Sequence, residues 1–281
     1  MDVIQIKRIL SEIKEYNRQI ENNGGKEGLN KFWIKFNYQE LTRFEILILG
    51  PEDTPYEAGW FYFTGMFPDN YPNAPPELIF RTTNKNRIRF HPNLYETGKV
   101  CLSILGTWSG QPWTPVMTLE TVCLSLRSIM NENPITNEPG FENEKITSAM
   151  ARNYICAARY NTVKYALIDH WNQKTNLPEE FQNIISFNMY GGLGLYGYYR
   201  ELVEGYQLCY LNRTMRSAND LAITEHVFDW KSLLKELSIH VGDWCLESEN
   251  RLKSERKFEN EVKLSISLGS QPKRRRFNNG I

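Results

Sequence analysis

The sequence lacks the hydrophobic and cysteine patterns that would place it in a membrane or outside the cell. Its 281 residues contain no signal peptide and no run of about 18 apolar residues. The five cysteines are scattered, with no Cys-x-x-Cys pair, and an odd number without metal-ligand spacing indicates reduced thiols. We therefore expect a soluble cytoplasmic protein with no membrane anchor and no metal site.

An excess of charge of one sign is also absent. The 33 basic residues balance 33 acidic ones. Proteins that bind nucleic acid usually carry a basic domain, so this neutrality argues against such a role. One basic run, 272–276, is open to two interpretations, a nuclear address or a solvated tail. Aromatic residues are plentiful, at 13%, and support a sizeable core.

Hydrophobic periodicity predicts a helix followed by strands. Apolar residues recur at helical spacing from Ile6 to Ile20, and the helix ends in the Asn-Gly run at 22–25. Alternation of apolar and polar residues then predicts strands at 32–38, 44–48, 60–67 and 78–80. Consecutive strands joined by short links indicate an antiparallel meander, which makes the fold class α+β.

Helices dominate the rest of the chain. Amphipathic spacing predicts helices at about 119–130 and 147–171. The character of the chain changes near 172, where a further helix begins at Leu177-Pro178 and a long one covers about 229–256.

One segment places a lone thiol near an amide side chain. It runs from His91-Pro92-Asn93 through a glycine-containing loop to Cys101. A cysteine hydrolase needs a base to form its thiolate, but His91 stands beside a proline in a predicted turn. The pattern therefore favours a thiol that accepts an acyl group activated elsewhere. A hydrolase that uses a distant histidine, at 170, 226 or 240, is a weaker alternative, as is a buried structural cysteine.

These motifs resemble those of the ubiquitin-conjugating enzymes. Gly50-Pro51, the Tyr-Pro-x-x-Pro-Pro segment at 71–76, His-Pro-Asn and the placed cysteine occur in that family's order. The resemblance covers about residues 1–170 and implies the UBC fold, with an N-terminal helix, a four-stranded antiparallel meander, an active-site loop and C-terminal helices. Segments 101–110, 113–115, 137–142 and 228–234 are similar to the long Z-type enzymes. They imply a helical extension at 171–262 that packs on the core, before a disordered basic tail at 263–281.

The resemblance also implies an activity. Cys101 would accept ubiquitin, or a related modifier, from an activating enzyme as a thioester and pass it to a substrate lysine or a ligase cysteine. No cofactor is implied, because ATP is consumed upstream. The implied partners are the modifier, the activating enzyme, ubiquitin ligases and protein substrates. The alternative is a catalytically silent module of the same fold that binds ubiquitin or a ligase, but the presence of both Cys101 and Asn93 favours the enzyme.

Further residues around the thiol are candidates for roles in the reaction. The Asn93 amide can donate to the oxyanion of the transition state, or it can hold the loop. His91, Pro92 and Ser103 are interpreted as structural parts of the active site. Three residues after the second helix either orient and deprotonate the acceptor lysine or serve only the loop: Asn133, Thr136 and Glu138.

Two surfaces carry over from the resemblance by position. Lys7 and Arg8 match the contact with the activating enzyme, although a solvated helix face is the ordinary alternative. Phe67, Pro115 and Val116 match the two loops that contact ligases, where an exposed Phe67 would be a hot spot and a buried one an ordinary core residue.

Overall fold

A computed structural model describes residues 3–22, 31–172 and 174–188, together with 232–233, 235–236 and 239. The chain begins with helix α1 (Val3–Asn22) and continues into strands β1 (Phe32–Phe36), β2 (Arg43–Leu49), β3 (Trp60–Met66) and β4 (Glu77–Phe80). The predicted helix and four strands are thereby confirmed.

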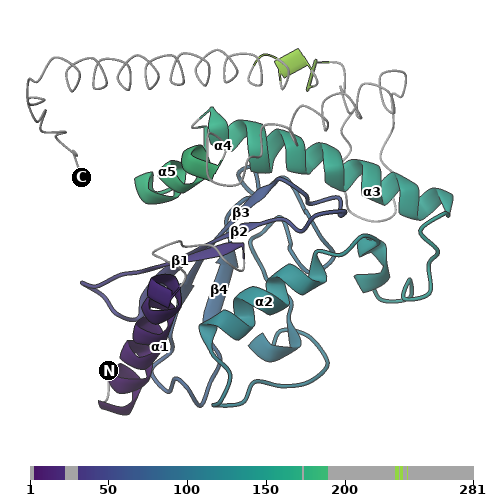
Figure 1. Cartoon of the computed structure of the whole chain (residues 1–281). Helices are drawn as coiled ribbons and strands as arrows, with labels where there is room; N and C mark the ends of the chain where they lie inside the picture. Colours follow the sequence, from purple (N-terminus) through teal and green to yellow (C-terminus); the bar gives the residue numbers. More distant parts are fainter. Residues whose placement is uncertain are drawn as a thin grey trace, which may run out of the picture. The chain divides into compact units, whose positions relative to one another are not determined.

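The four strands form one antiparallel sheet in the order β1-β2-β3-β4 (Figure 1). Register pairs such as Phe36 with Phe44 and Phe63 with Phe80 align aromatic residues across neighbouring strands. The rings of Phe63 and Phe80 pack 5.1 Å apart between centroids, and both are almost completely buried. This aromatic cluster forms the core beneath the helices, as the alternating apolar pattern predicts.

The later helices cover the sheet (Figure 1). Helix α2 (Leu119–Ile129) starts at a capping box formed by Thr118 and Thr121 and packs on β2. Helix α3 (Ala149–Asn161), the π-helical segment η3 (Thr162–Ile168) and α4 (Asp169–Trp171) form one continuous helical stretch, as predicted. The π segment contacts β3.

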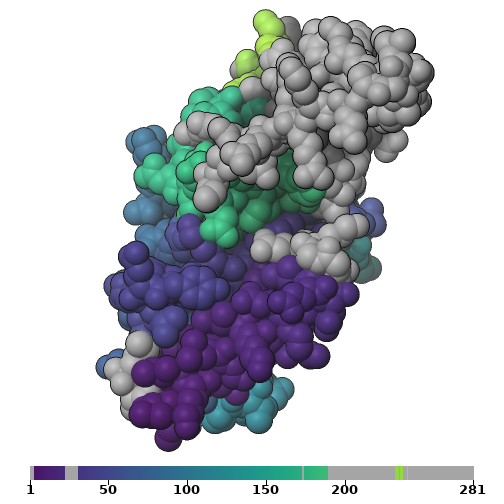
Figure 2. Space-filling view, turned by 60° about the vertical axis from the view of Figure 1, so that its left-hand side comes forward, coloured from purple at the N-terminus to yellow at the C-terminus, as the bar shows by residue number. Residues whose placement is uncertain are grey.

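Helix α1 is attached to the start of α2 by a buried carboxylate. Glu12 accepts hydrogen bonds from the Leu119 backbone N–H (2.9 Å) and from the hydroxyl of Tyr71. The Leu119 N–H is one of the groups at a helix start that have no partner within the helix. The helix, purple in the space-filling view, still forms part of the surface (Figure 2).

Helix α5 (Glu179–Phe187) lies in the predicted extension and contacts strands β1 and β3 of the sheet. The ring of Phe181 meets that of Tyr62 edge-on at 5.9 Å, and Glu180 lies 3.5 Å from the Lys35 ammonium. The predicted boundary at 170/171 falls within α4. Most of the extension and all of the predicted tail lie outside the described residues. Within the described part of the chain, no helix is both long enough and apolar enough to span a bilayer.

Candidate functional site

The backbone of Cys101 is held on both sides by Asn93. The Cys101 N–H donates to the Asn93 carbonyl at 2.9 Å, and Asn93 Nδ2 donates to the Cys101 carbonyl at 2.8 Å. Both residues are buried, with 1% and 4% of their surface exposed. Asn93 therefore performs the predicted loop-holding role. Because an amide carries two N–H bonds, donation to an oxyanion is compatible with this contact and stays a prediction.

His91 supports this loop and is not placed as a general base. It is completely buried, and its Nδ1 accepts the Asn93 backbone N–H at 2.9 Å. Burial lowers the pKa of His91 to about 3. The ring is thus neutral at physiological pH and its acceptor nitrogen is occupied, which fits the structural interpretation.

Arg89 joins the His-Pro-Asn segment to the loop after α2. Its Nη2 donates to the Pro92 carbonyl at 2.6 Å and to Glu138 Oε2 at 2.9 Å. The Glu138 carboxylate is thus paired with a buried guanidinium, and its predicted role in activating the acceptor lysine stays a prediction. The pairing joins residues 49 positions apart in the chain.

The other two candidates in this loop also serve its local structure. Asn133 Nδ2 donates to the Glu144 carbonyl at 2.8 Å, and Thr136 Oγ1 donates to the Asn133 carbonyl at 2.8 Å. The loop contains the short 3-10 helix η2 (Pro134–Asn137). The structure thus favours the loop role for both residues over the expected role in activating the lysine.

The ring of Tyr95 lies near two cations of the site. The guanidinium of Arg89 is 4.3 Å and the ammonium of Lys99 5.6 Å from the centroid of its ring. Burial raises the pKa of the Cys101 thiol, whereas the nearby Lys99, Tyr95 and Arg89 side chains act in the opposite direction. Cys101 is therefore mainly a protonated thiol at neutral pH. Sequence reasoning did not identify Arg89. The one local signal that could have indicated its role is a charged residue between two apolar neighbours, Ile88 and Phe90.

Thr107 holds the chain on the far side of Cys101. Its Oγ1 donates to the Val100 carbonyl at 2.7 Å and accepts the Leu102 N–H at 2.9 Å. The peptide groups before and after the cysteine thus share one hydroxyl. No local sequence signal distinguishes this threonine from an ordinary loop residue.

Ser103 opens the short 3-10 helix η1 (Ser103–Leu105) and supports the loop that follows it. Gly110, at φ +132°, packs so closely that a Cβ there would lie 3.0 Å from the Ser103 Cβ. Any residue with a side chain would be strained at this position. Ser103 therefore packs against Gly110, and its interpretation as a structural residue stays a prediction.

The two residues of the predicted contact with the activating enzyme, Lys7 and Arg8, differ in their surroundings. Lys7 is exposed. Arg8, in contrast, is paired with Glu12 at 2.7 Å and donates through Nη2 to the Met117 carbonyl at 2.6 Å. The guanidinium thus connects α1 to the segment before α2, and the contact of Arg8 with the activating enzyme stays a prediction.

The aromatic residue of the predicted ligase surface, Phe67, lies in the core. Phe67 is 1% exposed, with its ring 4.7 Å from that of Phe44 and 4.6 Å from that of Tyr71. The expected exposed Phe67 hot spot is therefore wrong, and the core alternative holds. Pro115 is exposed, and Val116 is 84% exposed, so this loop remains accessible.

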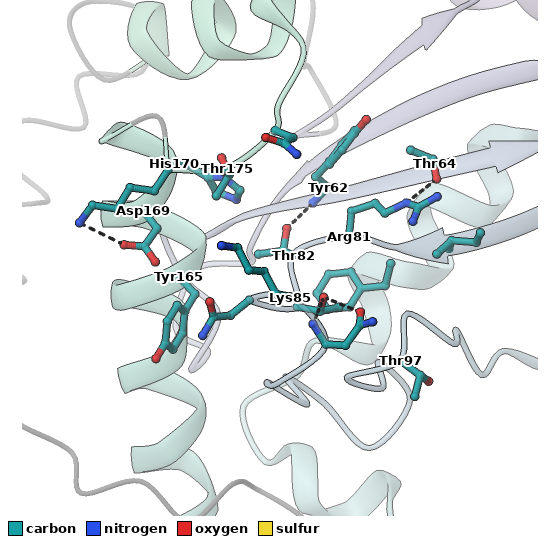
Figure 3. A pocket seen from close by; sticks show the side chains of 17 residues that line it. Tyr62, Thr64, Arg81, Thr82, Lys85, Thr97, Tyr165, Asp169, His170 and Thr175 are labelled. Atoms are coloured by element: carbon teal, nitrogen blue, oxygen red, sulfur yellow. Dashed lines mark hydrogen bonds and ion pairs between the residues drawn. The ribbon is translucent and has the colours of Figure 1, made fainter.

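A separate cavity of about 490 Å³ lies between the β3–β4 side of the sheet and the α3–α4 helical stretch (Figure 3). His170 lines it, and each ring nitrogen has a partner: Nδ1 lies 2.7 Å from Thr175 Oγ1 and Nε2 lies 2.8 Å from the Trp60 carbonyl. Burial lowers the pKa of His170 to about 4. Cys101 does not line this cavity. Neither His91 nor His170 therefore supplies the base that a hydrolase requires, and the other two histidines lie outside the described residues.

Comparisons with known proteins identify one family for this chain. The family model "Ubiquitin-conjugating enzyme" matches residues 8–160, more than half of the chain. Human "Ubiquitin-conjugating enzyme E2 Z" is 38% identical over 200 residues, covering 71% of this chain and 54% of that protein. The Xenopus tropicalis protein of the same name is 43% identical over 146 residues, covering 52% of this chain and 46% of that protein. The chain thus spans about half the length of these curated relatives.

A solved Toxoplasma gondii ubiquitin-conjugating enzyme domain aligns with a TM-score of 0.43 at 27% identity, covering 57% of this chain and 97% of that domain. The family match spans α1, the four strands, the segment around Cys101 and most of α3. The similarity to Z-type enzymes agrees with the resemblance found in the sequence. The chain belongs to the ubiquitin-conjugating enzyme family and has its fold.

Proposed function

We propose that this protein accepts the C-terminus of ubiquitin, or of a related modifier, on Cys101 as a thioester and transfers it onward. The observation that carries the proposal is a lone thiol whose backbone is clamped on both sides by Asn93, while the adjacent histidine is buried and occupied. A hydrolase would need a histidine that can take the proton of the thiol. A thiol that exchanges with an existing thioester does not, because the incoming group is already activated.

The transfer balances without a cofactor. The Cys101 sulfur attacks the carbonyl carbon of the thioester carried by the activating enzyme; a new C–S bond forms and the old one breaks. The electron pair of the broken bond leaves on the sulfur of the activating enzyme, which takes up a proton. The thiolate is the attacking form, so the proton of Cys101 passes to solvent.

The polar side chains of the loop after α2 already have partners within the protein, and this favours one class of acceptor. A lysine must lose a proton from an ammonium with a pKa near about 10.4, whereas a cysteine thiol has a pKa near about 8.5. Glu138, Asn133 and Thr136 are engaged in ion pairing and loop hydrogen bonds, and their side chains are poorly disposed to help a lysine. We therefore propose a ligase cysteine as the preferred acceptor, with free lysine used slowly.

The first test is a charging assay. The protein is incubated with ATP, ubiquitin and each activating enzyme in turn, beside a Cys101→Ala variant, and separated on gels with and without reductant. A reductant-sensitive adduct that depends on Cys101 is expected. No adduct with any activating enzyme or common modifier would overturn the proposal and leave the silent binding module as the better account.

The second test discharges the isolated thioester in single turnover. Free cysteine and free lysine are supplied at equal concentration, and the loss of adduct is followed over time. Rapid discharge to cysteine with slow discharge to lysine is expected. Since free cysteine is intrinsically more reactive, the ratio is compared with that of a small-molecule thioester, and an equal ratio would contradict the preference.

A further inference from the structure

The cavity that His170 lines carries more positive than negative charge. Three cationic side chains and one carboxylate line it: Arg81, Lys85, Lys174 and Asp169. The whole chain, in contrast, has equal numbers of basic and acidic residues. Most of the remaining lining consists of hydroxyl and amide side chains. The volume of about 490 Å³ lies within the usual range of small-molecule sites, and the lining suits a charged ligand.

The one carboxylate of the lining is already shared. Asp169 Oδ1 lies 3.2 Å from the Lys164 ammonium and 3.8 Å from the Lys174 ammonium. In the part of the chain that the structure describes, the Lys85 ammonium has no ion-pair or hydrogen-bond partner. Figure 3 shows the Lys85 side chain pointing into the cavity, toward the helical stretch that carries Asp169 and His170. The described residues therefore leave an excess of positive charge in this cavity.

The loop that carries Lys85 has a backbone conformation that residues other than glycine rarely adopt. Asn84, Lys85 and Asn86 have φ angles of 47°, 57° and 63°, all in the left-handed region. Asparagine tolerates this region because its short side chain can form local hydrogen bonds, but lysine has no such advantage. Backbone strain of this kind persists only where the surrounding structure fixes it, and it clusters at functional sites.

Thr83 fixes the strained turn. It is 4% exposed, and its Oγ1 accepts the Asn86 backbone N–H at 3.2 Å. Its carbonyl accepts the N–H groups of Arg87 at 2.9 Å and Ile88 at 3.0 Å. The helical side of the cavity is also fixed, because both ring nitrogens of the buried His170 have partners within the protein. The Lys85 charge is thus presented from a rigid frame, which lowers the entropic cost of binding a ligand.

We propose that this cavity binds a small anion that carries a phosphate group, with the Lys85 ammonium as its main contact. A phosphate ester has a charge of about −1.5 to −2 at neutral pH, which matches the excess of positive charge in the lining. Its oxygens accept hydrogen bonds, and the lining offers ammonium, hydroxyl and amide donors. Cys101 does not line this cavity, so the inference does not rest on the proposed thioester function.

The experiment titrates the full chain with pyrophosphate, inorganic phosphate and acetate at constant ionic strength and follows the backbone amides by NMR. We expect saturable shifts for the amides of 83–86 and 169–172. Pyrophosphate should bind more tightly than phosphate, because it carries more charge, and acetate should not reach saturation. Shifts that stay linear for all three anions, or an equal response to acetate, would overturn the proposal.

Lys85→Gly separates binding from stability. Glycine adopts the left-handed region without strain, so this variant should unfold at the same or a higher urea concentration than the wild type. Its affinity for pyrophosphate should nevertheless fall at least about tenfold, because a hydrogen bond to a charged group is lost. Lys85→Met, which removes the charge and keeps most of the bulk, should lose affinity to the same extent. The matched control is Lys31→Gly, which changes another lysine at positive φ (61°) outside the cavity lining and should bind as the wild type does.

Asp169→Asn should change the affinity in the opposite direction. It removes the carboxylate of the lining and releases two lysines, so pyrophosphate should bind about two- to fivefold more tightly. Wild-type affinity in both Lys85 variants would overturn the assignment. Equal losses in Lys31→Gly would show that binding follows net charge and not this cavity, which would also overturn it. These measurements need neither ubiquitin nor an activating enzyme, so their outcome is independent of the charging assay.

Discussion

The two chain segments that flank Cys101 differ in how they are held. Before the cysteine, the four residues of 91–94 are buried, and polar contacts from Arg89, His91 and Asn93 fix the backbone. After it, all residues of 106–112 are exposed, and contacts through Thr107 and Gly110 hold that loop to the site.

This difference suggests that the segment before Cys101 serves the reaction and that the segment after it serves contacts with partners. Positioning a reacting atom requires supports that do not move, since small misplacements cost large factors in rate. Contacts with partners tolerate variation and concentrate on loops. We therefore expect changes before Cys101 to alter stability and intrinsic rates. In the exposed segment after it, we expect changes at residues other than Thr107 to act mainly through partners.

The largest effect is expected when low pH protonates the buried histidines and destabilises the fold. His91 and His170 are neutral in the fold, where burial lowers the pKa of these side chains to about 3 and about 4, whereas an unfolded histidine titrates near about 6.5. The unfolded chain therefore binds more protons below pH 6.5. Their contribution is complete above that pH and is lost as the pH falls toward 4.

The expected loss in free energy of unfolding is about 1.4 kcal/mol per pH unit for each histidine, or about 4 kcal/mol for both by pH 5. Urea unfolding at pH 7.5, 6.0 and 5.0 measures it. A His170→Gln variant should show a shallower slope because one titrating group is gone. Equal stability of the wild type at pH 7.5 and 5.0 would show that the two rings are not held neutral.

The next largest effect is expected when the Asn93 side chain, which holds the Cys101 backbone, is removed. Asn93→Ala leaves the buried Cys101 carbonyl without its donor, which costs about 1–3 kcal/mol. Loss of an oxyanion donor slows comparable reactions by about 10²–10³. We expect single-turnover discharge to fall at least about tenfold, with exposed Asn143→Ala as the matched control. Discharge at the wild-type rate in a folded Asn93→Ala would remove the distinction between the two segments.

Thr107 tests how far the rigid part extends past the cysteine. Thr107→Val keeps the shape but leaves the Leu102 N–H and the Val100 carbonyl without their partner, and about 1–3 kcal/mol of stability should be lost. Thr107→Ser keeps the hydroxyl and serves as the control. Urea unfolding of both variants measures the difference. Equal stability of the two would place the hydroxyl outside the rigid part of the site.

The smallest effect on stability is expected at Val116. It is 84% exposed, so Val116→Asp should change the free energy of unfolding by no more than about 0.5 kcal/mol. Ligase-stimulated discharge should fall, because a charge replaces an apolar contact. Tyr38→Ser, which alters another exposed apolar residue at 69%, is the control. Equal ligase stimulation in both variants would show that this loop is not the ligase surface.

Much of the fold was predictable because its signals are local. The apolar periodicities of α1, α2 and the 149–171 stretch follow from neighbouring residues. The C-terminal end of strand β1 was predicted less accurately. The predicted strand reached Tyr38, but the structure ends it at Phe36, where the Asn37 side chain accepts the backbone N–H groups of Gln39 and Glu40 and starts a turn.

Within the site, the spacing of the His-Pro-Asn segment and Cys101 by itself determined that an amide and a thiol share one loop. Cys101 follows Asn93 by only eight positions, and so short a segment closes on itself. Tertiary structure alone decided the states of Glu138, Arg8 and Phe67. Each has at least one partner far away in the sequence, as with Arg8 and Met117, 109 residues apart. Whether a charge stands free or paired, and whether a ring is exposed or buried, depends on which distant segments the fold brings together. No local pattern in the sequence records those encounters.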